Sequence, residues 1–135
     1  LMHMQGNPET MQGAPHYENV VTEVFDALNR KLAELRQLGI SDVIIDPGFG
    51  FGKTIAHNFR LLQQLDFFHE LGCPLMIGLS RKGTVYKTLG VTAEEALNGT
   101  TVLHTLGLAR GAHILRVHDV KEAMEAIKLV MEVEG

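Results

Sequence analysis

Hydrophobic residues follow two alternating patterns along the chain. Short, continuous apolar runs are separated by longer segments in which apolar residues recur every three or four positions. The short runs predict buried β-strands and the periodic segments predict amphipathic helices, because these are the side-chain periods of the two structures. We expect strands at 1–4, 43–45, 74–79 and 113–117. We expect helices at 16–38, 56–71, 92–111 and from 119 onward, with a weaker helical turn at 84–89.

Local signals mark the ends and faces of these helices. Gly39 is a natural stop for the first helix, since glycine adopts the left-handed conformation that ends many helices. Thr92 with Glu95, and Asp119 with Glu122, have the spacing of an N-terminal capping box. In the last helix we expect four residues to face inward: Met124, Ile127, Val130 and Met131.

The order of elements is four strands, each followed by a helix. This order predicts an α/β protein in which parallel β/α units form one domain over residues 1–135. A complete barrel of eight such units needs about 250 residues. Four units in 135 residues are therefore half of a (β/α)₈ barrel. A free-standing open sheet of four strands is the alternative.

Composition and charge narrow the class of protein. The formal net charge is −4 and no Lys/Arg run carries interleaved aromatics, so we expect no nucleic-acid partner. No apolar run approaches the ~20 residues of a membrane span, and no signal peptide opens the chain, so we expect no membrane partner and a cytoplasmic location. The single cysteine, Cys73, excludes an internal disulfide and is expected to be a buried, inert thiol. The chain begins inside an apolar run, which indicates a piece of something longer.

A glycine-rich segment, 46–53, follows the second predicted strand and leads into a helix. Its sequence is Asp-Pro-Gly-Phe-Gly-Phe-Gly-Lys, and its glycines let the backbone approach a ligand closely because they have no Cβ. Neither the phosphate-binding P-loop nor the dinucleotide fingerprint fits its spacing. A purely structural strand-to-helix turn is the alternative interpretation.

Polar and charged residues also follow the other predicted strands. Because the carboxyl ends of parallel strands share one face, side chains from four loops should converge on one pocket. They are Met2 and His3, Asp46 with Phe51 and Lys53, Gly78 with Ser80 to Lys82, and Arg116 with His118. An anionic ligand with a flat polar ring would suit this set. A buried aspartate can accept hydrogen bonds from the N–H edge of a heterocycle, and arginine can stack on a ring and bind phosphate in a fork.

Several charged residues also have a structural interpretation. Lys53 is expected to be solvated at the start of a helix, and Arg81 to be a surface or dimer-contact cation. His3 is either a pocket residue or a hydrogen-bonded core histidine. Asp119 is expected to cap the last helix.

Four segments together resemble the dihydropteroate synthase family of folate biosynthesis, the target of sulfonamides. The segments 2–8, 46–53, 80–82 and 116–119 stand in the family's order and spacing, and the match covers essentially the whole chain. The resemblance implies a TIM (β/α)₈ barrel, of which this chain would be the C-terminal half, strands five to eight. It also implies a dimer, which the family forms through helices of this half.

The resemblance implies a substrate pair and a binding site. The family joins 6-hydroxymethyl-7,8-dihydropterin diphosphate to p-aminobenzoate, giving 7,8-dihydropteroate and pyrophosphate. By resemblance, Asp46 would bind the amino-pyrimidine edge of the pterin, and Met2 and Gly78 would line the pterin slot. Phe51 would pack against the aminobenzoate ring, and Ser80 would lie close by.

The same resemblance assigns the catalytic roles to Lys82, Arg116 and His118. Lys82 would bind a polar atom of the pterin near the incoming amine. Arg116 would stack on the pterin and, with His118, hold the diphosphate. No protein nucleophile is required, because loss of diphosphate can leave a delocalised cation and the site need only stabilise the leaving charge. The implied cofactor is Mg²⁺, whose ligand we expect from the N-terminal half that this chain lacks, so no metal ligand is assigned here.

Two departures from the family pattern limit what the isolated chain is expected to do. The N-terminal half, with further pterin-binding residues and two mobile loops, is absent. Gly83 stands where many relatives carry a serine that contacts the aminobenzoate carboxylate. We therefore expect an inactive or weakly active chain that associates, as a homodimer or by pairing half-barrels. The alternatives are a barrel that moves a methyl group from a folate to a corrinoid, and a non-catalytic half-barrel.

Overall fold

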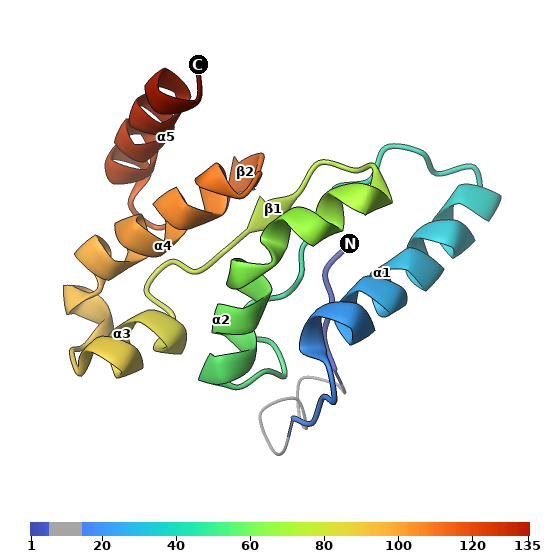
Figure 1. Ribbon diagram of the computed structural model, residues 1–135, viewed down its shortest axis with the longest axis horizontal. Coiled ribbons are helices and arrows are strands. Elements are labelled where there is room, and N and C mark those ends of the chain that lie inside the picture. Colours follow the sequence, from blue (N-terminus) through green and yellow to red (C-terminus); the bar gives the residue numbers. More distant parts are fainter. Residues whose placement is uncertain (6–14) are drawn as a thin grey trace.

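The computed structural model describes residues 1–5 and 15–135 of the chain. Most of its regular elements are helices, and two short strands lie between them (Figure 1). The α-helices are α1 (Val20–Gln37), α2 (Ile55–Gln63), α3 (Gly83–Leu89), α4 (Leu97–Ala109) and α5 (Val120–Glu134). Two 3₁₀ helices, η1 (Leu65–Leu71) and η2 (Ala93–Glu95), and two strands, β1 (Met76–Ile77) and β2 (Ile114–Leu115), complete the order.

Four extended segments pair in parallel, each with the next one along the chain. The paired residues are Met2 with Asp46, Ile45 with Leu75, Met76 with Ile114 and Ile77 with Leu115. The predicted α/β class with parallel pairing is confirmed. The regular strands are shorter than predicted, since β1 and β2 have two residues each, and isolated bridges instead of continuous ladders join the first two segments to their neighbours.

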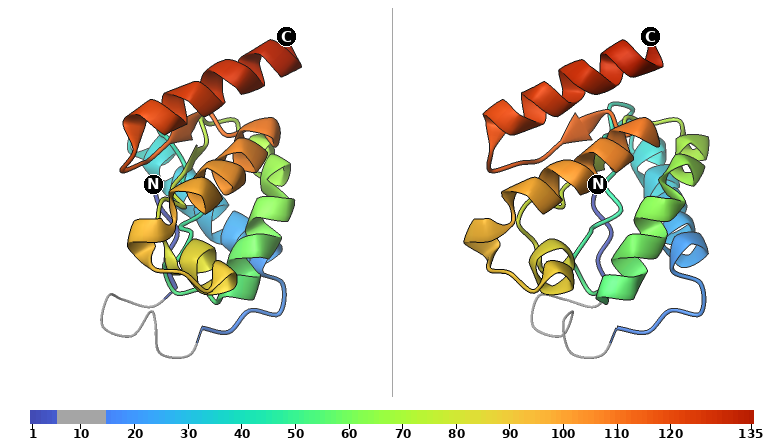
Figure 2. Two further views of the ribbon diagram at one scale, coloured as in Figure 1. Left: turned by 90° about the vertical axis from the view of Figure 1, so that its left-hand side faces the viewer. Right: turned by 60° about the vertical axis from the view of Figure 1, so that its left-hand side comes forward.

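The helices that connect the parallel segments pack in chain order. Helix α1 contacts α2, α2 contacts α3, α3 contacts α4, and α4 contacts α5. In Figures 1 and 2, α5 lies at one end of the molecule beside α4 and projects beyond the other helices. The loops that connect each parallel segment to the next helix therefore lie at the carboxyl ends of the segments.

The main hydrophobic core lies between the parallel segments and the helices α1 and α2 with η1. Helix α1 buries the face that its periodicity predicts: Val20, Val21, Val24, Leu28 and Leu32. The parallel segments contribute Ile45, Leu75, Ile77 and Leu79 to the same core. Each fully buried aliphatic side chain of this kind stabilises the fold by roughly 2 kcal/mol relative to an exposed one.

Helix α1 begins and ends at residues with identifiable caps. The Asn19 side chain accepts a hydrogen bond from the backbone N–H of Thr22, at 3.1 Å, so the helix begins later than its apolar pattern predicts. Gly39 has a φ of 82° and follows the helix, which confirms the predicted stop.

The predicted second and third helices are each divided into two parts. The segment predicted at 56–71 is α2 followed by the 3₁₀ helix η1, because the chain tightens after Gln64. The capping box of Thr92 and Glu95 is present, but it caps the N-terminus of the short 3₁₀ helix η2. Helix α4 begins two residues after η2 ends.

The prediction for the inward face of α5 is wrong for two of its four residues. Met124 and Met131 are 47% and 67% exposed, and Ala126 is the buried residue of this helix. Ile127 and Val130 are half-buried. Since α5 packs mainly against α4, much of its apolar surface has no neighbour among the described residues.

The structure also bears on the expected burial of Cys73 and on membrane-spanning helices. Cys73 is half-buried instead of buried, and its Sγ lies 3.6 Å from the carbonyl oxygen of Leu71. Within residues 1–5 and 15–135, no helix is both long and apolar enough to cross a membrane.

Candidate functional site

A pocket of about 320 Å³ lies where the loops that follow β1 and β2 meet. It is lined by Phe51, Gly78, Ser80, Arg81, Lys82, Arg116, Val117 and His118. The structure therefore brings together six of the eight predicted site residues: Phe51, Gly78, Ser80, Lys82, Arg116 and His118. They come from three different loops, as expected for residues at the carboxyl ends of parallel strands.

Asp46 lies next to this pocket and is 6% exposed. Its Oδ1 accepts a hydrogen bond from the backbone N–H of Gly48, at 2.8 Å, and no described residue donates to Oδ2. Burial raises the pKa of Asp46, while the Gly48 N–H and the charges of Lys82 and Lys53 oppose that rise. One carboxylate oxygen is thus held by the loop, and the other can accept from a ligand.

Met2 does not line the same pocket as the other predicted site residues. Its backbone pairs with Asp46, but its side chain is 37% exposed. It borders a separate hollow of about 480 Å³ beside α1, together with Leu1, His3 and Met4. The remaining predicted segment, residues 6–8, lies outside the described residues.

The glycine-rich loop places its two phenylalanines on opposite sides. Phe49 is 1% exposed and belongs to the core, whereas Phe51 faces the pocket. The glycines between and around them make this possible, since Gly48 and Gly50 have φ values of 78° and 81°. At Gly48 no other residue fits, because a Cβ there would overlap the carbonyl oxygen of His3. The pocket position expected for Phe51 therefore agrees with the structure, whereas the burial of Phe49 in the core was not predicted.

Lys53 is buried, so the prediction of a solvated lysine is wrong. It is 5% exposed, and its Nζ donates to the carbonyl oxygens of Gly48, at 2.8 Å, and Phe51, at 3.1 Å. Nδ1 of His3 lies 3.1 Å away. Burial lowers the pKa of Lys53 to about 7, against the opposing charge of Asp46. The physical reason is that the loop turns its carbonyl groups inward and supplies the acceptors that a buried ammonium needs.

His3 is a half-buried, hydrogen-bonded residue and does not line the pocket. Burial and, to a smaller extent, the charge of Lys53 lower its pKa to about 4. A neutral ring can accept from the Lys53 ammonium at Nδ1. This geometry favours the interpretation of His3 as a hydrogen-bonded structural residue over that of a pocket residue.

Lys82 ends the loop after β1, and its side chain reaches the glycine-rich loop. Its Nζ donates to the carbonyl oxygen of Phe49, at 2.7 Å, and lies 4.8 Å from the centroid of the Phe51 ring. Burial lowers the pKa of Lys82, the charge of Asp46 opposes this, and the charge of Arg116 adds to it. At Gly78 a Cβ would lie 3.8 Å from this Nζ, so glycine keeps the space beside the ammonium open.

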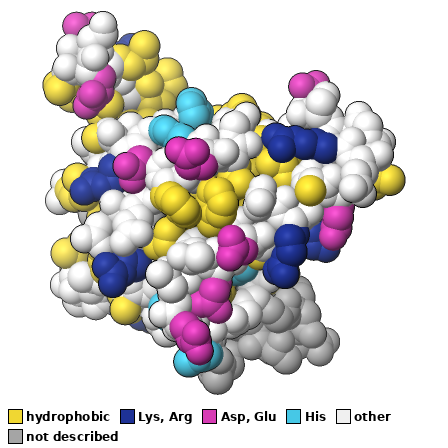
Figure 3. Space-filling view, turned by 45° about the vertical axis from the view of Figure 1, so that its right-hand side comes forward, with side chains coloured by type: hydrophobic (Ala, Val, Ile, Leu, Met, Phe, Trp, Pro, Cys, Tyr) yellow, Lys and Arg dark blue, Asp and Glu magenta, His cyan; other side chains and the backbone are white. Residues whose placement is uncertain are grey.

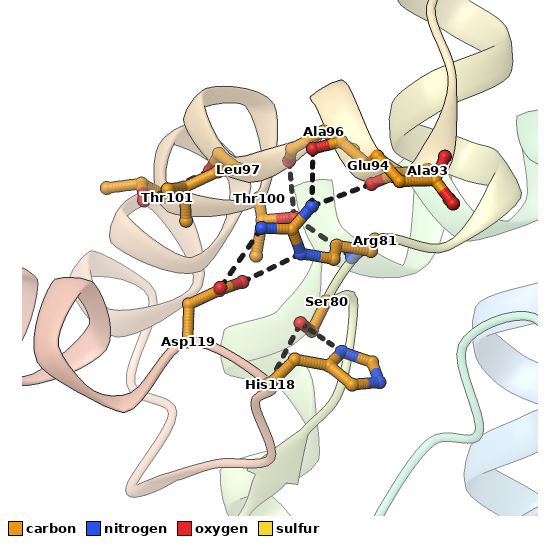
Figure 4. A network of polar contacts seen from close by, with 10 residues as sticks. All are labelled: Ser80, Arg81, Ala93, Glu94, Ala96, Leu97, Thr100, Thr101, His118 and Asp119. Carbon is orange, nitrogen blue, oxygen red and sulfur yellow. Dashed lines mark hydrogen bonds and ion pairs between the residues drawn. The ribbon is translucent and has the colours of Figure 1, made fainter.

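Ser80 and His118 join the two pocket loops by a pair of hydrogen bonds (Figure 4). The Ser80 Oγ lies 2.7 Å from His118 Nδ1, and it accepts from the backbone N–H of His118 at 3.1 Å. When the hydroxyl donates to Nδ1, the ring proton resides on Nε2 and can be donated to an anion. Ser80 therefore orients the imidazole as well as lining the pocket.

Arg116 is exposed, and none of the described residues makes a hydrogen bond or ion pair with its guanidinium group. The charge of Arg116 lowers the pKa of the nearby Lys82, which shows that two cations share the pocket. Such a pocket favours a ligand that carries negative charge.

Arg81 and Asp119 form an ion pair, which corrects two predictions. The Arg81 Nε and Nη2 donate to the Asp119 carboxylate at 2.9 and 3.0 Å, so Arg81 is not a free surface cation. Asp119 is the residue before α5, but its side chain makes no capping hydrogen bond because Arg81 occupies both oxygens.

Two buried polar residues that support the site were missed by the sequence analysis. Asn58, 2% exposed, accepts from the N–H of Gly50 at 3.0 Å and donates to Thr84 Oγ1 at 2.8 Å. His104, also 2% exposed, accepts from the N–H of Leu79 at 3.0 Å. The available signal was a polar residue on a helical face that is otherwise apolar.

The described residues do not form a site for Mg²⁺. Nowhere in residues 1–5 and 15–135 do three or more His, Cys, Asp or Glu side chains gather closely enough to hold a metal ion. The pocket lining contains Arg81, Lys82 and Arg116 but no carboxylate, whereas Mg²⁺ requires oxygen ligands. No role is therefore assigned to a metal within this part of the chain.

Comparisons of sequence and structure give consistent results. Residues 1–118 match the family described as "Pterin binding enzyme". Dihydropteroate synthase of Escherichia coli (strain K12) is 46% identical over 132 residues, which cover 96% of this chain and 47% of that protein. The chain thus spans about half the length of the curated relatives it matches.

Solved structures of dihydropteroate synthases resemble the chain closely. That of Stenotrophomonas maltophilia, with active site-bound imidazole, has a TM-score of 0.96 and 43% identity, covering 100% of this chain and 52% of that one. That of Thermus thermophilus in complex with 4-aminobenzoate has a TM-score of 0.94 and 37% identity, covering 100% and 56%. On the family match, these relatives and the pocket geometry, the chain belongs to the family of pterin-binding enzymes.

Proposed function

We propose that residues 1–135 are the C-terminal half, strands five to eight, of the (β/α)₈ barrel of a dihydropteroate synthase. The whole enzyme would join 6-hydroxymethyl-7,8-dihydropterin diphosphate to p-aminobenzoate and release pyrophosphate. The observation that carries this proposal is the convergence of Lys82, Arg116 and His118 on one pocket, beside the buried Asp46. The relatives named dihydropteroate synthase support it.

Asp46 supplies the recognition of the pterin in this proposal. Its Oδ1 is fixed by the Gly48 N–H, so the carboxylate is oriented before a ligand arrives. Its Oδ2 can accept from an amino-pyrimidine edge. Hydrogen bonds from such an edge would favour the charged form of a carboxylate whose pKa burial raises. Gly78 leaves room for a flat ring beside Lys82. The backbone of Asp46 is held by hydrogen bonds to Leu1 and His3, on either side of Met2.

Arg116 and His118 supply the stabilisation of the leaving group. As the bond between the pterin methylene carbon and the diphosphate oxygen breaks, its electron pair moves to that oxygen. The guanidinium of Arg116 and the Nε2–H of His118 can stabilise this developing charge, and Ser80 holds the imidazole in place. The arylamine nitrogen then bonds to the methylene carbon and loses a proton, which the released pyrophosphate can accept.

Lys82 and Phe51 form the side of the pocket that would receive p-aminobenzoate. The Phe51 ring offers a flat apolar surface for the aromatic substrate. The Lys82 ammonium lies 4.8 Å from the centroid of that ring, donates to the carbonyl oxygen of Phe49 and interacts with the charge of Asp46. Lys82 can therefore contact both substrates.

The remaining parts of the proposal concern the whole enzyme. Mg²⁺ would be held by the N-terminal half of the barrel, as the resemblance to the family implies. We expect a cytoplasmic enzyme that forms a homodimer. The isolated chain would bind the pterin substrate but turn it over weakly or not at all.

Calorimetric titration of the chain with 6-hydroxymethyl-7,8-dihydropterin diphosphate tests the proposal. We expect saturable binding by the wild type and by Arg60→Met, a control that changes an exposed arginine on α2. Addition of p-aminobenzoate and Mg²⁺ should give little or no dihydropteroate. Absence of binding would overturn the proposed site, whereas rapid turnover would overturn the requirement for a second half.

A further inference from the structure

Arg81, which lines the pocket itself, has an unusual backbone conformation between two other pocket residues. Its φ is 52°, and no other non-glycine residue among those described has a positive φ. This conformation is unfavourable for a residue with a Cβ and persists only where the surroundings enforce it. Its neighbours Ser80 and Lys82 both contribute to the pocket through their side chains.

The surroundings that enforce this conformation are the contacts of the Arg81 guanidinium group (Figure 4). Nε and Nη2 bind the two carboxylate oxygens of Asp119 at 2.9 and 3.0 Å. Nη1 donates to the carbonyl oxygens of Ala93, at 2.9 Å, and Glu94, at 2.7 Å. The guanidinium is thus engaged on three sides by the protein, and the Arg81 side chain is only 23% exposed.

The backbone of Arg81 is also held. Its N–H donates to Thr100 Oγ1 at 2.9 Å, and that hydroxyl donates to the Ala96 carbonyl at 2.7 Å. The loop after β1 is therefore fixed both to the start of α4 and to the residue before α5. Beside this contact, Ser80 pairs with His118. Two consecutive residues of one loop thus bind two consecutive residues of the other.

We propose that the Arg81–Asp119 ion pair is a positioning clamp that holds the loop carrying Lys82 in register with the loop carrying Arg116 and His118. The clamp sets the spacing of these three groups for a ligand that carries a diphosphate. The identity of that ligand rests on the function proposed above. Arg81 is a positioning residue: its donors are engaged by the protein, and it acts through Ser80 and Lys82.

The substitution Asp119→Ala distinguishes the clamp from simple electrostatics. Removal of a carboxylate close to a cationic pocket strengthens anion binding if only the field matters. If the ion pair acts as a clamp, its removal instead weakens anion binding, because the two loops lose their register. The two explanations therefore predict opposite signs for one measurement. The substitution deletes no capping hydrogen bond from α5, since Asp119 makes none.

The experiment is calorimetric titration of the chain with inorganic pyrophosphate. We expect Asp119→Ala and Arg81→Met each to weaken binding about tenfold, and the double variant to be no weaker than either by more than about twofold. Arg81→Lys, which keeps the charge but not the fork, should lie between wild type and Arg81→Met. The exposed control Arg60→Met should match wild type. Unchanged or tighter binding by Asp119→Ala would overturn the clamp.

A second measurement tests the clamp independently of the proposed function. The N–H of His118 is bonded to Ser80 Oγ, so its hydrogen exchange reports the contact between the loops without any ligand. We expect faster exchange in Arg81→Met and in Arg81→Lys, but not in Arg60→Met. If the wild type binds no pyrophosphate, the proposed anion site is wrong. The hydrogen exchange of the His118 N–H then still tests whether the clamp holds the two loops together. Unchanged exchange in Arg81→Met would overturn the clamp whatever the ligand result.

Discussion

The ammonium nitrogen of Lys53 lies 3.1 Å from Nδ1 of His3, a residue fifty positions earlier in the chain. The same ammonium donates to the carbonyl oxygens of Gly48 and Phe51. A single buried cation therefore closes the glycine-rich loop and ties it to the first parallel segment. This arrangement fixes the backbone on both sides of the loop, next to Asp46 and at Phe51.

The burial of Lys53 predicts a characteristic pH dependence of stability. Its pKa is lowered from 10.5 to about 7 in the folded chain, so between these values the unfolded chain binds more protons. The stability of the wild type relative to Lys53→Met should therefore rise from pH 7 to 10, by at most about 1.4 kcal/mol per pH unit. Denaturant unfolding of both proteins at several pH values measures this difference. The exposed control Lys128→Met should run parallel to wild type, and a parallel Lys53→Met curve would contradict the prediction.

Two glycines with similar backbone angles should respond differently to alanine. Gly39 and Gly48 have φ values of 82° and 78°, but a Cβ at Gly39 meets nothing within 4 Å, whereas one at Gly48 overlaps the His3 carbonyl oxygen. We expect Gly39→Ala to cost roughly 1 kcal/mol, from backbone strain alone. Gly48→Ala should cost about 3 kcal/mol or more, because the first parallel segment must move. Equal losses in denaturant unfolding would show that the contact with His3 does not constrain the loop.

His104 should contribute to the loss of stability in mild acid. Burial lowers its pKa from 6.5 to about 4, so the unfolded chain binds more protons in this window. The contribution is fully present above pH 6.5 and is lost as the pH falls towards 4. The substitution His104→Gln keeps an acceptor for the Leu79 N–H and should make stability less dependent on pH across the window. His69→Gln, at an exposed position, serves as control; an unchanged slope in His104→Gln would refute the prediction.

The isolated chain should associate in solution. Helix α5 exposes Met124, Leu129, Met131 and Val133, and Figure 3 shows hydrophobic side chains gathered across another part of the surface, between charged ones. Open edges of parallel segments and exposed apolar surface both favour pairing with another chain. We expect sedimentation to show dimers or larger species at micromolar concentration, and Leu129→Glu to shift them towards monomer more than Lys128→Glu does. A monodisperse wild-type monomer would contradict this expectation.

The sequence predicted the parts of the molecule that depend on local pattern. The face of α1, the parallel order of the segments and the pocket position of Lys82, Arg116 and His118 all follow from periodicity and from strand ends. The parts that were wrong depend on partners far away in the chain. No local pattern shows that Asp119 binds Arg81 instead of capping α5, since the two residues are 38 positions apart.

The same distinction explains the outcome within the glycine-rich loop. Its glycines predicted that the backbone approaches another group closely, and at Gly48 the structure shows such an approach to the carbonyl oxygen of His3. The burial of Phe49 and Lys53, and the support from Asn58, require the loop to be folded against α2 and the core. Such contacts are determined by tertiary packing and have no signal at the spacing of neighbouring residues.

Separate titrations with 6-hydroxymethyl-7,8-dihydropterin and with inorganic pyrophosphate test the proposed division of the site most directly. Wild type, Asp46→Asn and Arg116→Gln are compared by calorimetry. We predict that Asp46→Asn weakens pterin binding at least about tenfold, because a buried acceptor is lost, and leaves pyrophosphate binding within about twofold. Arg116→Gln should weaken pyrophosphate binding. Unchanged pterin binding by Asp46→Asn, or an equal loss of both ligands, would contradict the assignment of Asp46 to the pterin.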